Sequence, residues 1–147
     1  MKKLLPLLLL ILIGCSEPEP IDYEMLVKRG GLYYKKNTNE VYSGPVFNVE
    51  GLYSTDLLPI YGQGYIKKGK RHGKFEFYRS NGQLYTEYSY KDGLKDGIQK
   101  LYYKNGQLFS KTTWKDNLPL NSISYSENGL IKPSRRPRPF PPRNSKK

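Results

Sequence analysis

Residues two apart along several stretches of the chain share a chemical character, which is the pattern of β-strands with two different faces. Between residues 84 and 90, one such face carries Leu84, Thr86, Tyr88 and Tyr90. At the positions 24 residues further on, the same face carries Leu108, Ser110, Thr112 and Trp114. We expect the two leucines, and the pair Tyr90 and Trp114, to stack as a seam between neighbouring hairpins.

This alternation belongs to a tandem repeat with a period of 24 residues. The stretch 69–84 aligns with 93–108, an eroded third copy spans 117–130, and an earlier copy begins near residue 41. We interpret residues 54–63 as a loop insertion. The Asn-Gly pairs at 81–82 and 105–106 favour tight hairpin turns, because both residues tolerate positive φ. The pattern therefore predicts an all-β fold, an antiparallel β-meander of tandem hairpins.

The repeat pattern G-x-x-x-G-x-x-x-x-Y-x-x-N-G-Q-L resembles the MORN repeat variant of bacterial proteins, including YwqK-type proteins labelled as antitoxins. It is carried by Gly73, Tyr78 and Asn81-Gly82, and then by Gly97, Tyr102 and Asn105-Gly106. The resemblance covers roughly residues 30–130 and departs from the pattern at 54–63 and in the last copy, where Asn117 and Asn121 replace the glycine pair. It implies a binding or scaffolding sheet, and we assign residues 30–131 to a MORN-variant β-repeat domain.

The N-terminus has the organisation of a secretory signal. A positively charged start is followed by an apolar run of ten residues, Leu4 to Ile13, which is shorter than the ~20 residues that span a bilayer. Leu12-Ile13-Gly14-Cys15 resembles a bacterial lipobox, in which the cysteine receives a diacylglycerol and the chain is cut before it. The resemblance implies a signal peptide over 1–14, a lipidated Cys15 with a spacer over 15–29, and a lipoprotein of the bacterial cell envelope, held in the outer membrane if the cell is Gram-negative. The alternatives are an ordinary cleaved signal and a buried apolar strand.

The positive charge is concentrated at the C-terminus. The chain has 25 Lys and Arg against 13 Asp and Glu, a net charge of +12, but residues 15–131 hold 16 of the basic and all 13 of the acidic residues. Residues 132–147 contain seven basic residues, five prolines and no acid, which predicts a disordered tail. Such a tail can keep the protein soluble, dock on anionic lipid or cell-wall polymer, or bind a proline-recognising partner or nucleic acid; export makes nucleic acid an unexpected partner. Its candidate electrostatic residues are Arg135, Arg136, Arg138 and Arg143.

The sequence offers little for a metal or a catalytic site. One Cys and one His exclude an internal disulfide framework and speak against structural zinc. His72 lies in a turn sequence without a positioned partner, and Gly62-Gln63-Gly64 has no following helix that would make a phosphate loop. We therefore expect no metal, no cofactor and no enzymatic activity.

Aromatic side chains are the remaining candidates for function. The chain has 14 Tyr, 5 Phe and 1 Trp, more rings than one small core can cover, and exposed aromatic patches mark contact surfaces. The same rings can also serve packing within the sheet. The candidate binding face consists of Tyr78, Tyr88, Tyr90, Tyr102 and Trp114.

Together these features predict a lipid-anchored envelope protein whose sheet is a non-catalytic binding or scaffolding surface for a protein or an envelope polymer. One alternative is a YwqK-type antitoxin or immunity protein that inhibits a partner toxin. Another is an enzyme acting on cell-wall polymers, for which the carboxylates to consider are Glu76, Glu87 and Asp92.

Overall fold

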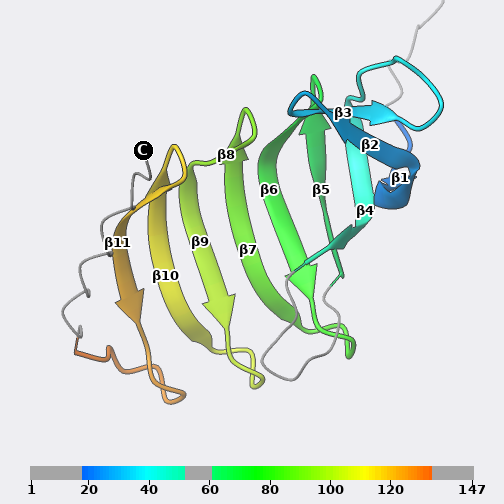
Figure 1. The fold of residues 1–147 in the computed structure, drawn as a ribbon. Coiled ribbons are helices and arrows are strands. Elements are labelled where there is room, and N and C mark those ends of the chain that lie inside the picture. The colour runs from blue at the N-terminus through cyan, green and yellow to red at the C-terminus, as the bar shows by residue number, and fades with distance from the viewer. Residues whose placement is uncertain (1–17, 52–60, 134–147) are drawn as a thin grey trace, which may run out of the picture.

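The computed structural model describes residues 18–51 and 61–133, and this part of the chain is built almost entirely of β-strands (Figure 1). The main sheet has the order β1-β4-β5-β6-β7-β9-β10-β11, with β8 attached to β7, and β2 and β3 form a separate hairpin. Only β1 and β4 pair in parallel, and the other described pairings are antiparallel. The prediction of an antiparallel meander is confirmed. The elements are β1 Ile21–Asp22, the 3-10 turn η1 Tyr23–Met25, β2 Leu26–Arg29, β3 Leu32–Lys35, β4 Gly44–Glu50, β5 Tyr61–Lys67, β6 Lys70–Tyr78, β7 Leu84–Lys91, β8 Leu94–Lys95, β9 Gly97–Tyr102, β10 Leu108–Lys115 and β11 Leu118–Ser124.

At one end of the sheet the hairpins turn through two residues with positive φ, which matches the twist of the flanking strands. The turns are Lys68-Gly69, Asp92-Gly93 and Asp116-Asn117, spaced by the repeat period. Asparagine adopts this left-handed backbone more readily than most side chains. The third copy, which the sequence shows as eroded, therefore keeps its turn although Asn117 replaces the glycine.

At the other end, each repeat makes a longer loop closed by the same two backbone hydrogen bonds. In the loop 79–83, the Arg79 N–H donates to the Gln83 carbonyl and the Gly82 N–H donates to the Arg79 carbonyl, both at 2.8 Å, and the loops 103–107 and 126–130 repeat this pair. The predicted hairpins form, and in each Asn-Gly pair only the glycine takes a positive φ. The Asn81 side chain instead accepts the Gln83 N–H at 3.1 Å, a local turn that asparagine favours.

The core lies where the N-terminal segment covers one face of strands β4 to β6. Two glycines of β5 leave room for the rings that fill it, because a Cβ on Gly64 would lie 2.4 Å from Phe75 Cδ1 and one on Gly62 would lie 2.6 Å from Phe77 Cδ1. The pair of glycines in β5 is therefore a packing feature. The buried cluster consists of Leu26, Tyr42, Val46, Val49, Ile66, Phe75 and Phe77.

Two sequence-based boundaries need correction. Residues 15–29 were expected to be a spacer, but Ile21–Asp22 pairs with Val46–Phe47 and Leu26 is 7% exposed. The folded domain therefore begins near residue 21, not at residue 30. The local sequence is polar and proline-rich, so it does not itself indicate a strand. The strand forms because it pairs with β4, which lies about 25 residues further along the chain. Strand β5 begins at Tyr61, so the insertion expected over 54–63 ends earlier than predicted.

Beyond β7 the described sheet is a single layer. No described residue after Thr86 is buried, and Leu118 and Leu120 of β11 are 66% and 65% exposed. Figure 1 shows the β2–β3 hairpin crossing the sheet only at its β4–β5 end. The face that carries the core is therefore uncovered beyond β7. Within the described ranges, no helix has the length and apolar character needed to cross a membrane.

Candidate functional site

A groove lies where the covered core gives way to the open sheet, on the face that bears Phe75, Phe77 and Tyr88. We call this the groove face, and the side bearing Glu76 the opposite face. The groove has a volume of about 530 Å³, and it combines aromatic rings with two cations and one acid. Its lining residues are Glu50, Gly51, Arg71, Phe77, Tyr85, Thr86, Tyr88, Tyr90, Lys95, Gln99 and Leu101.

Arg71 occupies the covered end of the groove among aromatic rings. Its guanidinium carbon lies 5.2 Å from the ring centroid of Phe75 and 5.6 Å from that of Tyr90. It donates a hydrogen bond to the Tyr23 hydroxyl at 2.9 Å, while its Nε–H is buried without a hydrogen-bond partner. Burial acts to lower the pKa of Arg71, but the hydroxyls of Tyr23, Tyr33 and Tyr90 outweigh it and raise the pKa above its ordinary value. A permanent positive charge is therefore fixed at this end.

Lys95 occupies the open end, between two rings. Its Nζ lies 4.3 Å from the ring centroid of Tyr88 and 4.6 Å from that of Trp114. The Trp114 indole is held in place because its Nε1–H donates to Gln99 Oε1 at 2.8 Å. Burial, and then repulsion from Arg71, lower the pKa of Lys95. In the described part of the chain no carboxylate pairs with this ammonium, so the ring faces stabilise it instead.

The two cations are equivalent residues of successive repeats. Arg71 and Lys95 are separated by the period of 24, and so are Tyr90 and Trp114. In each copy the cation lies over the ring of the same copy. The expected stacking of Tyr90 on Trp114 is not among the described ring–ring contacts. Neither cation was predicted from the sequence. The signal that marks them is the basic residue at the same position of each repeat, 24 residues apart.

The predicted aromatic set is divided between the two faces of the sheet. Tyr88 and Tyr90 line the groove, and Trp114 joins them through its contact with Lys95, a lining residue. Tyr78 lies on the opposite face, where its hydroxyl donates to Glu76 Oε2 at 3.0 Å. Tyr102 shares that face, because it lies two residues from Lys100, which pairs across the strands with Glu87. Three of the five predicted residues therefore belong to the groove, and two do not.

Two of the three carboxylates considered for an enzyme, Glu76 and Glu87, form ion pairs on the opposite face. Glu76 and Glu87 lie directly across from each other on β6 and β7, but Lys74 lies 2.6 Å from the first and Lys100 lies 2.6 Å from the second. Hydrogen bonds from Lys74 and Gln63 lower the pKa of Glu76, whereas a general acid needs a raised pKa. The pair therefore serves an ion-pair network better than acid–base chemistry.

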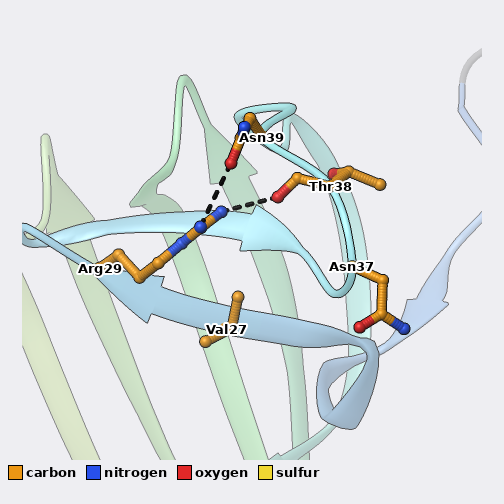
Figure 2. Close-up of a pocket in the computed structure, with 5 residues that line it drawn as sticks. All are labelled: Val27, Arg29, Asn37, Thr38 and Asn39. Carbon is orange, nitrogen blue, oxygen red and sulfur yellow. Dashed lines mark hydrogen bonds between the residues drawn. The ribbon is translucent and has the colours of Figure 1, made fainter.

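A second hollow lies between β2 and the loop after β3 (Figure 2). Its one charged side chain is Arg29, which donates to the Thr38 carbonyl at 2.7 Å and to Asn39 Oδ1 at 3.3 Å. The same guanidinium lies 4.4 Å from the ring centroid of Tyr34. Arg29 therefore holds the loop after β3 against β2.

The remaining candidates fall away from the groove or outside the described residues. His72 Nδ1 lies 3.8 Å from Asp92 Oδ1 at the turn end of the sheet. Within 18–51 and 61–133, no group of three or more His, Cys, Asp or Glu side chains is placed to hold a metal ion. The signal peptide, Cys15 and the tail arginines at 135, 136, 138 and 143 lie outside the described residues.

Comparison with protein families matches two adjacent segments, residues 71–92 and 95–116, to the family described as MORN repeat variant. These segments begin at Arg71 and at Lys95, so each repeat brings one cation of the groove. The resemblance inferred from the Gly, Tyr and Asn-Gly spacing is confirmed for these two repeats. No curated protein and no solved structure matches the chain.

Proposed function

From a sheet that contains two MORN repeat variants, we propose that the chain is a lipid-anchored protein of the bacterial envelope whose groove face is a non-catalytic binding surface. The observation that carries the proposal is the difference between the faces. On the opposite face, lysines are paired with glutamates at 2.6 Å. On the groove face, Arg71 and Lys95 lie on aromatic rings and keep their charge available to a partner.

The anchor is supported by the order of a charged start, an apolar run and Leu12-Ile13-Gly14-Cys15. A protein held by two or more acyl chains stays on a bilayer, whereas one chain gives only marginal binding. Labelling of cells with palmitate is expected to mark the protein and to fail for Cys15→Ser. Persistent labelling of that variant, or a protein found in the cytosol with residues 1–14 attached, would contradict the anchor.

The binding surface is tested by placing a photo-crosslinking phenylalanine analogue at position 88, inside the groove. The control is the same analogue at position 111, because Lys111 pairs across the strands with Lys100 on the opposite face. We expect adducts in intact cells from position 88 and few from position 111. Equal adducts from both positions, or none from position 88, would refute the groove as the binding surface. A toxin encoded beside this gene and captured at position 88 would favour the antitoxin alternative.

A further inference from the structure

We infer that the groove binds an anionic glycan, a chain of sugar rings that carry carboxylates. The inference rests on the proposed binding surface and names the ligand chemistry that fits it. Three features of the groove carry it: cations that pair with no carboxylate among the described residues, aromatic rings beside these cations, and neutral hydrogen-bonding groups along the same face.

The cations select for negative charge. Lys95 and Arg71 line the groove with one acid, Glu50, which makes no ion pair with either of them among the described residues. A neighbouring hollow of about 390 Å³ shares Arg71 and adds Lys28 and Lys70 against one acid, Asp92. Because charge complementarity steers partners and fixes their register, a ligand with regularly spaced anions suits a surface whose cations recur with the repeat.

The rings beside these cations suit a flat ligand with C–H groups. An aromatic face is negative and attracts the weakly positive C–H face of a sugar ring, as it attracts a cation. Tyr88 and Trp114 both contact Lys95, so a sugar ring that packs beside either one brings its carboxylate within reach of the ammonium. A single ligand unit can therefore meet a ring and a cation at once.

Neutral polar groups continue the surface toward β11. Gln99 accepts from Trp114 through Oε1, and its amide N–H groups have no partner within the described residues. Thr112 and Ser122 lie side by side with their hydroxyl oxygens 2.9 Å apart. Hydroxyl and amide groups both donate and accept, which matches the hydroxyl groups of a sugar chain.

Other anionic polymers fit less well. A peptide binds most readily by adding a strand to a sheet edge, but the groove lies on a face between strands that are already paired. A nucleic acid is held through many phosphate contacts, while the groove itself offers two cations. Both polymers nonetheless serve as probes.

The test measures binding of the full-length chain, purified in a mild detergent, to four polymers at fixed ionic strength. Polygalacturonate carries sugar rings and carboxylates, dextran has rings without charge, poly-glutamate has carboxylates without rings, and duplex DNA carries phosphates. We expect polygalacturonate to bind most tightly. Lys95→Gln should weaken that binding by about tenfold, as expected when a charged contact is lost, and Lys95→Arg should largely restore it.

The matched control is Lys111→Gln, which removes the same charge from the opposite face and should change the affinity by less than about twofold. The basic tail is present in every variant, so a difference between the Lys95 and Lys111 variants reports on the sheet. If poly-glutamate binds as tightly as polygalacturonate and loses affinity equally with Lys95→Gln, that result would assign the groove to an acidic peptide. DNA binding that is tighter than polygalacturonate binding would assign the groove to nucleic acid. Equal losses for the Lys95 and Lys111 variants would overturn the inference. If polygalacturonate fails while position 88 still crosslinks specifically in cells, the glycan is wrong and the binding surface stands.

Discussion

Replacing Gly64 with alanine tests whether the strand beneath the buried rings must lack a side chain. The Cβ would lie 2.4 Å from Cδ1 and 2.5 Å from Cε1 and Cγ of Phe75, against the ~3.5–4.0 Å at which carbon atoms attract. The ring must move by roughly an ångström to restore contact, yet it is fully buried and packed edge-on against Tyr90 with centroids 5.2 Å apart. Overpacking of this kind costs about 2–3 kcal/mol.

Gly64 has no positive φ, so the backbone itself accepts alanine. Any loss of stability therefore reports the clash between the new Cβ and the Phe75 ring. Urea unfolding followed by far-UV circular dichroism should show the loss, and the melting temperature should fall by roughly 10 °C. Lys67→Ala, at an exposed position of the same strand, is the control and should change stability by less than about 0.5 kcal/mol.

A double-mutant cycle tests whether the Phe75 ring causes the loss of stability in Gly64→Ala. In a Phe75→Leu background the clashing ring is gone, so Gly64→Ala should lose most of its effect, with a coupling energy of about 1–2 kcal/mol. An effect of the same size in both backgrounds, or a Gly64→Ala protein as stable as the parent, would show that the glycine is not needed to seat Phe75.

Three further predictions concern other parts of the sheet. Thr86→Val should destabilise the fold by roughly 1–2 kcal/mol in urea unfolding, because Thr86 is buried and its hydroxyl donates to the Lys100 carbonyl at 2.8 Å; Thr113→Val is the control, and equal effects would argue against the bond. Lys68→Asn should raise stability by roughly 0.5 kcal/mol, since Lys68 has a φ of 48°; a loss of stability would contradict the turn assignment. The Lys74 hydrogen bond holds the pKa of Glu76 below its ordinary value of 4.5, so its stabilisation is present above that value and is lost as the pH falls through the folded-state pKa. As the pH falls from 6 to 3, the urea midpoint of Glu76→Gln should therefore fall less steeply than that of the parent protein. Parallel plots of midpoint against pH for the two proteins would refute the assignment.

The repeat made the strands and turns predictable because each copy carries its own turn residues. The loop 126–130 forms the same two hydrogen bonds as 79–83, because the third copy keeps its Asn128-Gly129 pair. The N-terminal boundary was not predictable in the same way. The pairing of Ile21–Asp22 with β4 and the burial of Leu26 depend on contacts distant in sequence, which a local polar pattern does not encode.

The composition of the site was predictable only in part. Aromatic residues were identified by type, but the face of each one was not assigned from the sequence. Side chains alternate along a strand, so Tyr78 lies with Glu76 and Tyr102 lies with Lys100, both on the opposite face. Arg71 and Lys95 were overlooked because surface cations usually belong to ion pairs or to solvent, whereas here they lie on rings.

The most direct test of a groove that binds a partner uses the single tryptophan of the chain. Trp114 gives one indole N–H signal in a proton–nitrogen NMR spectrum, and that N–H lies at the groove, bound to Gln99. Titration with polygalacturonate oligomers should shift this signal saturably, and Lys95→Gln should require about tenfold more ligand for the same shift. A signal that stays in place while resonances from Lys74, Glu76 and Tyr78 move would put the binding surface on the opposite face and contradict the account.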